Sequence, residues 1–170
     1  MLCLTLAGAA PAPPASLEYA VKASYLYKFA PFVQWPPQAF ASPDAPITIC
    51  ILGDDPFGPM LDDVVKGQHV EAHPYLVRRI RAAARGMGCN ILFLAHPTTQ
   101  SPAEALRAVA GEPVLTVTDG AAASAGGMIQ FQLQDGRVRF NADEAAAESS
   151  GVPISSKLLD LAASVHRAAK

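Results

Sequence analysis

Two histidines in this sequence have the spacing of a metal site. His69 and His73 lie four residues apart, and on a helix that spacing places both imidazoles on one face, as in many zinc proteins. Gly67 and Pro74 bracket the pair, and neither residue is compatible with a regular helix through this stretch. We therefore predict no metal site.

Four aspartates nearby could hold calcium or act as a general acid and base: Asp54, Asp55, Asp62 and Asp63. Carboxylates also gather for a simpler reason at the start of a helix, where they stabilise the positive end of the helix dipole. A helix over residues 57–65, which Asp54 or Asp55 can cap, explains most of the cluster.

The serines near the C-terminus do not form a catalytic motif. Ser155-Ser156-Lys157 lacks the Ser-x-x-Lys spacing of penicillin-binding enzymes, and a serine ahead of an apolar run with helical spacing is typical of a helix N-cap. No histidine stands beside a credible nucleophile or carboxylate in the sequence. We predict that the protein is not an enzyme and uses no cofactor.

A glycine pair, Gly126-Gly127, enters an apolar run and permits close backbone approach or an anion-binding turn. The G-x-G-x-x-G spacing of a dinucleotide site is missing, and no Gly-Lys-Ser/Thr follows. A tight turn is the favoured interpretation.

The composition excludes a nucleic-acid partner. The 170 residues are 51% hydrophobic and only 16% charged, with a net charge of −2, whereas nucleic-acid binding needs clustered Lys and Arg. The one basic cluster, Arg78-Arg79-Ile80-Arg81 with Arg85, is short and is typical of a solvated strand end.

Residues 1–16, MLCLTLAGAAPAPPAS, resemble the end of a secretory signal peptide followed by a Pro-rich linker, although a basic n-region is missing. We expect export to the periplasm. No other run reaches the roughly 18 consecutive apolar residues of a membrane span, so we predict that the mature protein does not cross the membrane.

The segment from Tyr19 to Phe40 holds seven of the twelve aromatic residues, including Trp35, the only tryptophan. It has helical spacing up to Trp35-Pro36-Pro37, and its apolar residues form two stripes rather than one. The helix is then either buried on nearly all sides, or it turns its second stripe to a partner. That second stripe comprises Val21, Tyr25, Phe29 and Phe32.

Cysteine usage is compatible with export. Cys3 would leave with the leader, and Cys50 and Cys89 remain in two runs that can be neighbouring strands of a parallel sheet. A bridge closing a loop of about 40 residues would stabilise the fold by roughly 4 kcal/mol in the chain-entropy model. Two reduced core cysteines are the alternative, because free Cys is among the most buried residue types.

Strand-like and helix-like segments alternate, which indicates one α/β domain over residues 17–170 with a mixed, largely parallel central sheet flanked by helices. Asp135-Gly136 between alternating runs predicts a C-terminal β-hairpin. We expect the chain to end on an amphipathic helix over residues 155–168. The other expected strands cover residues 47–53, 75–80, 90–95 and 114–118, with a helix from Ser101 to about Ala110.

Seven fragments occur in an order and spacing that resemble the YfiR family of small secreted bacterial proteins, from about Leu17 to Ala163. They are YAVKASYLYKFAPFVQWP, ITICILGDDPFGPML, GCNILFLA, PVLTVTD, SAGGMIQF, GRVRF and ISSKLLDLA. The resemblance implies a periplasmic repressor of a YfiN-type membrane diguanylate cyclase, often with an outer-membrane lipoprotein as antagonist. Its output would be cyclic di-GMP and biofilm formation.

The resemblance also favours a Cys50–Cys89 disulfide, since the family commonly carries a pair at these positions. Two residues depart from the family pattern. Pro31 predicts a kink or an early helix end near Phe29. Asp143 replaces a typical Asn, and an ionised Asp accepts hydrogen bonds but cannot donate them.

For such a repressor, binding energy should come from aromatic anchors and Arg. We expect partner contacts from Tyr25, Phe29, Phe32, Trp35, Arg78 and Arg79, with Gly126 and Gly127 shaping a nearby surface. The aromatic stripe could equally form a homodimer, which we also expect.

The alternative function is a periplasmic small-ligand sensor. Its pocket would lie at the carboxyl ends of the parallel strands, near Gly53 and Asp119, and Arg78, Arg79 and the glycine pair could line it.

Overall fold

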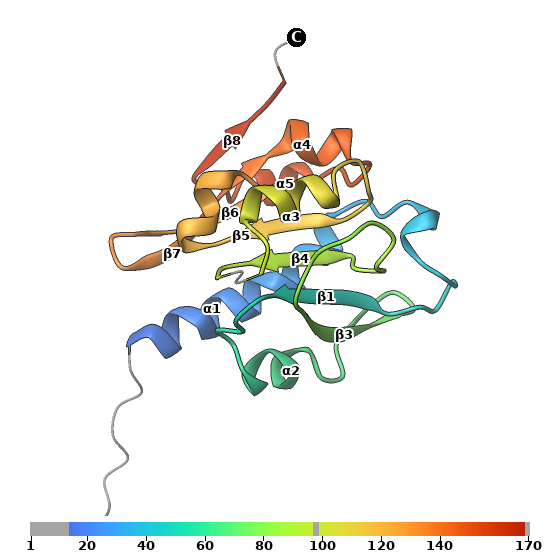
Figure 1. The fold of residues 1–170 in the computed structure, drawn as a ribbon, viewed down its shortest axis with the longest axis horizontal. Coiled ribbons are helices and arrows are strands. Elements are labelled where there is room, and N and C mark those ends of the chain that lie inside the picture. The colour runs from blue at the N-terminus through green and yellow to red at the C-terminus, as the bar shows by residue number, and fades with distance from the viewer. Residues whose placement is uncertain (1–13, 97–98, 169–170) are drawn as a thin grey trace, which may run out of the picture.

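The computed structural model describes residues 14–96 and 99–168, and it builds them around one eight-stranded sheet (Figure 1). The strand order is β2-β3-β1-β4-β5-β6-β7-β8. Strands β3, β1, β4, β5 and β6 run parallel to one another. Strand β2 pairs antiparallel with β3, β7 pairs antiparallel with β6, and β8 pairs parallel with β7. The predicted α/β class with a mixed, largely parallel sheet is confirmed.

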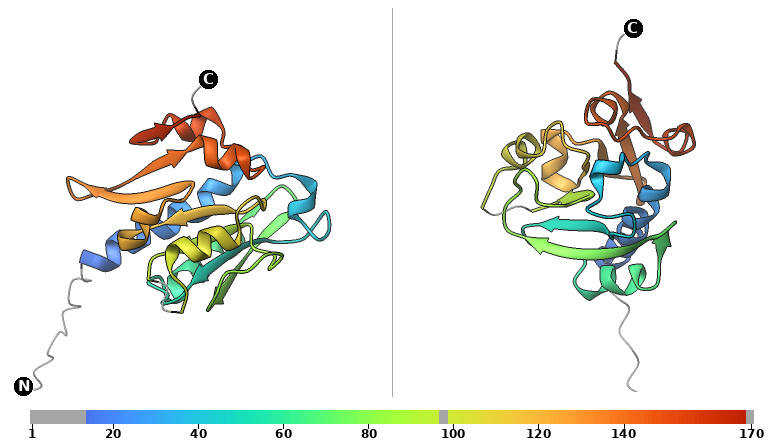
Figure 2. Two further views of the ribbon diagram at one scale, coloured as in Figure 1. Left: turned by 45° about the horizontal axis from the view of Figure 1, so that its top comes forward. Right: turned by 90° about the vertical axis from the view of Figure 1, so that its right-hand side faces the viewer.

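The strands are β1 (Ile47–Leu52), β2 (His69–Val70), β3 (His73–Ile80), β4 (Ile91–Leu94), β5 (Leu115–Thr118), β6 (Ile129–Gln134), β7 (Arg137–Asp143) and β8 (Ser164–His166). The helices are α1 (Pro14–Phe29), α2 (Pro59–Val65), α3 (Pro102–Ala108), α4 (Glu144–Ser149) and α5 (Ser156–Leu159). Short 3-10 helices cover η1 (Ala30–Phe32), η2 (Pro37–Ala39) and η3 (Gly120–Ala125). Figure 2 shows α2 on one side of the sheet and α3 on the other.

The central strands are buried on both faces, as their continuous apolar runs predict. Successive side chains of β1 alternate between two cores, because strand residues point to opposite faces. Ile49 and Ile51 pack with α1 and α2, whereas Cys50 and Leu52 pack with α3 and η3. Both cores must therefore form for β1 to be covered.

Individual residues in the sequence determine where the helices begin and end. Pro31 lies in η1, and α1 ends at Phe29, as predicted from the lost N–H donor of proline. Helix α3 starts where predicted, and Ser101 and Glu104 form a capping box there. The start of α2 was predicted wrongly: the helix begins at Pro59 after Gly58, because Asp55 accepts a hydrogen bond from the Phe57 N–H (2.8 Å) and makes a turn instead of a cap.

The predicted hairpin is confirmed. Asp135 and Gly136 connect β6 to β7 with φ values of 51° and 71°. Positive φ at both central residues is the requirement of a type I′ turn, whose twist matches that of the two strands.

The predicted helix over residues 155–168 is wrong in its extent. Helix α5 stops at Leu159, and the chain then turns to add β8 beside β7, with Val165 opposite Ala142. The Ala163 N–H donates to the Phe140 carbonyl (2.8 Å) where this pairing begins. The open hydrogen-bonding edge of β7 outweighs the helical spacing of the apolar residues, and it leaves Leu161 exposed.

The predicted leader and linker, residues 1–16, lie outside the described residues up to position 13, and residues 14–16 form the start of α1. Within the described part of the chain, no helix is both long and apolar enough to span a bilayer.

Candidate functional site

A disulfide joins Cys50 of β1 to Cys89, just before β4, with the two Cα atoms 5.8 Å apart. The strands are neighbours, as predicted. The Arg78 guanidinium lies beside both sulfurs, at 3.6 Å from Cys50 Sγ and 3.4 Å from Cys89 Sγ, and it also donates to the Met87 carbonyl. A single guanidinium nitrogen, Arg78 Nη2, makes all three contacts, so Arg78 covers the disulfide.

Arg79 is held by the aspartate cluster. Its guanidinium donates to Asp55 (2.8 Å), to Asp62 (2.6 and 3.0 Å) and to the Gly58 carbonyl (2.8 Å). The hydrogen bond from Arg79 lowers the pKa of Asp62 below its ordinary value. Two of the four aspartates that invited a calcium or acid-base interpretation therefore serve to join β3 to the start of α2.

The glycine pair is a packed turn. Gly127 has φ 113°, and a Cβ there would lie 2.9 Å from the Thr118 side chain. The Thr118 hydroxyl donates to the Gly126 carbonyl (2.6 Å). Since β1, β4 and β5 separate β3 from β6, Arg78 and Arg79 do not share a surface with the glycines. The structure therefore does not form the predicted cleft of arginines and glycines.

The aromatic stripe of α1 divides between core and surface. Phe29 is 1% exposed and packs against Tyr25, Phe131 and Phe140, with ring centroids 5.3 to 5.8 Å apart. Phe29 is therefore a core residue, and its predicted partner contact is wrong. Tyr25 and Phe32 are half-buried, whereas Val21 is exposed.

A buried ion pair fills the carboxyl end of β5. Lys22 of α1 donates to both Asp119 carboxylate oxygens at 2.8 Å, contacts Glu18, and lies 4.7 Å from the centre of the Tyr19 ring. Asp119 is as buried as Lys22, so the ion pair occupies the carboxylate that was predicted to lie at a ligand pocket. The sequence predicted no role for Lys22, because no local pattern indicates a contact with a residue 97 positions away.

Burial and the neighbouring carboxylates act on Tyr19. Burial first, and then the charges of Asp119 and Glu18, raise the pKa of Tyr19 to about 12. A neutral phenol therefore persists beside Asp119 well above ordinary pH.

An exposed apolar face lies between the start of α1 and the β6–β7 hairpin. We call it the α1–hairpin face; it encloses a hollow of about 640 Å³ and comprises Leu17, Val21, Leu133 and Val138. Leu133 and Val138 are opposite each other in the hairpin, and Leu133 follows the core residue Phe131 by two positions on the same side of the strand. In Figure 1 the start of α1 and the hairpin tip project from the same side of the molecule.

A family model described as YfiR/HmsC-like matches residues 19–163, well over half of the chain. The chain belongs to the YfiR/HmsC-like family. This family is periplasmic, and it is regulatory rather than catalytic.

The YfiR/HmsC-like match begins inside α1 and ends directly before β8, so both sides of the α1–hairpin face lie within it except for Leu17. Asp143, the departure from the family pattern, acts as an acceptor in this YfiR/HmsC-like chain. Its carboxylate caps α4 through the Ala146 N–H (2.9 Å) and lies 3.1 Å from His166 Nδ1. An acceptor is all that this position requires.

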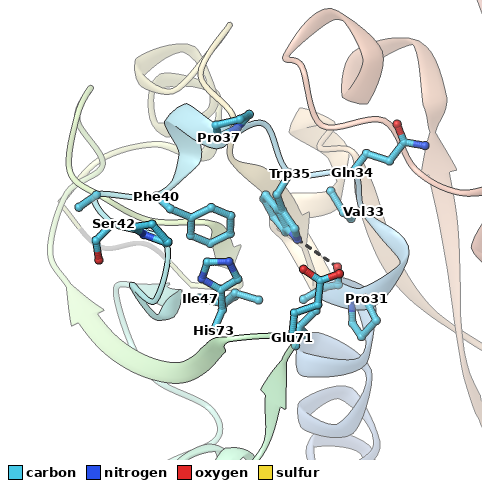
Figure 3. A pocket seen from close by; sticks show the side chains of 14 residues that line it. Pro31, Val33, Gln34, Trp35, Pro37, Phe40, Ser42, Ile47, Glu71 and His73 are labelled. Carbon is cyan, nitrogen blue, oxygen red and sulfur yellow. Dashed lines mark hydrogen bonds between the residues drawn. The ribbon is translucent and has the colours of Figure 1, made fainter.

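Trp35 belongs to a second hollow, at the other end of α1, which we call the Trp35 cavity (Figure 3). Its volume is about 690 Å³. The indole N–H donates to the Ala30 carbonyl (3.0 Å), and Phe40 lies edge-on to the indole with ring centroids 6.5 Å apart. Ile47, the first residue of β1, and His73, the first of β3, also line the cavity, so it lies at the amino ends of these strands.

Proposed function

We propose that this YfiR/HmsC-like protein is a non-enzymatic periplasmic repressor that binds the periplasmic domain of a YfiN-type membrane diguanylate cyclase. Binding would hold the cyclase inactive and so lower cyclic di-GMP and biofilm formation. An outer-membrane lipoprotein would act as the antagonist that removes the repressor. Family membership supports the regulatory class, and the observation that carries a binding function is the α1–hairpin face.

Apolar side chains gather on this face instead of being scattered. Among the described residues, five large apolar side chains are exposed, and three of them, Leu17, Val21 and Leu133, lie here. A contiguous apolar patch with a polar rim is typical of a protein contact, whereas single exposed leucines are common. Glu18 and Arg137 supply charged groups at the edge of the hollow. We therefore place the cyclase contact here.

The face is held in a fixed shape. Lys22, one residue beyond Val21, anchors the helix to Asp119 of the sheet, and the type I′ turn fixes the hairpin tip. A preformed surface loses little conformational entropy on binding, which raises affinity for a given area. Tyr25 lines an adjoining hollow that shares Val21, so it extends the same surface along α1.

The test is a binding titration of the mature protein against the periplasmic domain of a membrane cyclase from the same cell, with and without reductant. We expect Leu133→Ser to weaken binding at least tenfold, because a buried apolar anchor contributes about 1.4 kcal/mol or more. Leu76→Ser is the matched control: Leu76 is also a strand leucine, with 48% exposure against 54% for Leu133, but it lies on β3.

Two outcomes of this titration would overturn the proposal. One is that no cyclase domain binds under either redox condition. The other is that Leu133→Ser and Leu76→Ser weaken cyclase binding equally. The loss would then come from removing exposed apolar area anywhere on the surface, and not from the α1–hairpin face.

A second candidate function, a periplasmic small-ligand sensor, is supported by the Trp35 cavity. Its volume falls in the range of about 300 to 1,000 Å³ that is usual for small-molecule sites. It lies away from the predicted position at Asp119, at the opposite ends of the parallel strands. The two functions are compatible, because the cavity and the α1–hairpin face share no residue.

A further inference from the structure

We propose that the Trp35 cavity binds a small organic cation, an ammonium group on a short aliphatic chain. This inference rests on the second candidate function, the ligand sensor, and is independent of the cyclase contact. It is carried by the aromatic walls of the cavity, by the charge of its lining and by the hydrogen-bonding groups that face it.

Aromatic rings form the walls. Figure 3 shows Trp35, Phe40, His73 and Glu71 around one space, contributed by the segment after α1 and by the β2–β3 hairpin. Phe40 stacks on the His73 ring with centroids 3.9 Å apart and an angle of 13° between the planes. The hydrogen bond from Trp35 Nε1 to Ala30 fixes the indole, the best aromatic partner for a cation.

The lining carries negative charge only. Of its fourteen residues, Glu71 is the one carboxylate, and none is Lys or Arg. Within residues 14–96 and 99–168, the Glu71 carboxylate makes no ion pair. Glu71 also has φ 52°, a left-handed conformation that is uncommon for a residue other than Gly, Asn or Asp. An anionic ligand would meet repulsion here, whereas a cation would find a counter-charge.

His73 lines the cavity, and its tautomer follows from one contact. His73 Nδ1 lies 2.6 Å from the Ala45 carbonyl, and since a carbonyl can only accept, Nδ1 carries the proton. In the neutral ring Nε2 then has a free lone pair. A group with several N–H donors matches a carboxylate and an imidazole acceptor better than a quaternary ammonium does, so we assign a primary ammonium.

The cavity is built in advance. Asn90 holds the loop around Phe40 by donating to the Ala39 carbonyl (3.0 Å) and accepting from the Thr48 N–H (2.8 Å). The Gln34 N–H donates to Pro153 (3.0 Å), which ties the other wall to the segment before α5. A ligand therefore finds its walls in place and pays little to order them.

Trp35 is the only tryptophan, so its fluorescence reports the cavity directly. The experiment titrates the full mature protein with putrescine, a four-carbon diamine, and in parallel with 1,4-butanediol, which has the same chain without charge. We expect a saturable change with the diamine, with a dissociation constant of about 1 mM or lower, and at least tenfold weaker binding of the diol.

Glu71→Gln should weaken diamine binding at least tenfold, and Phe40→Leu should weaken it as well. Glu148→Gln, an exposed glutamate of α4 outside the cavity, is the matched control and should bind like the unmodified protein. Circular dichroism verifies the fold of each variant. If Glu71→Gln does not fold, the diamine and diol titrations of the unmodified protein decide the question without it.

Equal binding of diamine and diol would overturn the proposal, as would the absence of any saturable change with the diamine. Unchanged affinity in a folded Glu71→Gln variant would do the same. Leu133→Ser separates this inference from the repressor function, because that variant should lose cyclase binding and keep diamine binding.

Discussion

Lys22 and Asp119 are two charges taken out of water and placed against each other. Burying each ion alone would cost several kcal/mol, and the pair is tolerated because both carboxylate oxygens accept from Nζ and Glu18 adds a further contact. The pair lies where helix α1 crosses the end of β5, so at the residue scale it determines how α1 sits on the sheet.

Lys22→Met should therefore destabilise the protein by about 3–5 kcal/mol, because it leaves Asp119 charged and buried without its partner. The double variant Lys22→Met/Asp119→Leu should recover most of that loss, since it removes both charges. Urea unfolding of the two variants and the unmodified protein measures the difference. A loss below about 1 kcal/mol for Lys22→Met would show that the pair behaves like an exposed salt bridge.

Ionisation of Tyr19 should lower the stability of the protein at alkaline pH. Its pKa is raised to about 12 in the folded state, whereas an unfolded Tyr ionises near 10. Below pH 10 the phenol is neutral in both states, so its contribution is fully present. Between pH 10 and about 12 the unfolded chain binds fewer protons than the native one, and stability falls as the pH rises.

Thermal unfolding at pH 9 and pH 11 measures this effect. Tyr19→Phe should show a smaller drop between the two values than the unmodified protein does. Some drop should remain, because burial also raises the pKa of Tyr75, which donates to the Tyr27 carbonyl. Identical drops in both proteins would contradict the assignment to Tyr19.

At the element scale, periodicity predicted strands better than it predicted the C-terminus. The runs around Ile49 and Phe93 are apolar on both faces, so they can only be central strands, and the Asp135-Gly136 turn fixes one hairpin register. The spacing of Leu158, Leu159 and Val165 fits a helix, but periodicity carries no information about the open edge of β7 that β8 joins.

The candidate sites show the same limit. The disulfide could be predicted because a family resemblance supported it, and Trp35 could be singled out because it is the only tryptophan. The α1–hairpin face could not be predicted, because Leu17 and Leu133 come together only once the sheet has formed. Phe29 and Val21 share one helical stripe, and only the packed structure separates the buried residue from the exposed one.

The Cys50–Cys89 disulfide links β1 to the start of β4, and its removal should act on the unfolded state. Cys50→Ala/Cys89→Ala should destabilise the protein by up to about 4 kcal/mol, because a loop of 39 residues is no longer closed. Denaturant unfolding of the double variant measures this loss. The same variant should retain the fold, since both positions lie in an apolar core that alanine can occupy. An unchanged midpoint would contradict the prediction.

At the scale of the whole molecule, α1 connects two surfaces of different chemistry. Its first turns border the apolar α1–hairpin face, and its last residues lead into the Trp35 cavity. The two share no lining residue, so occupation of the cavity need not block a protein at the face. Helix α1 borders both surfaces, and the Lys22–Asp119 pair holds it to the sheet.

The expected homodimer belongs to the same scale, and the α1–hairpin face is the surface that we expect it to use. A chain that exposes Leu17, Val21 and Leu133 together gains by pairing them with a second copy when no cyclase is present. Sedimentation velocity at tens of micromolar should then show a dimer, with Leu133→Ser monomeric and Leu76→Ser dimeric. Adding the cyclase domain should convert the dimer into a complex with one repressor chain, because both partners compete for one face. A dimer that survives Leu133→Ser would place self-association on another surface and leave this face to the cyclase alone.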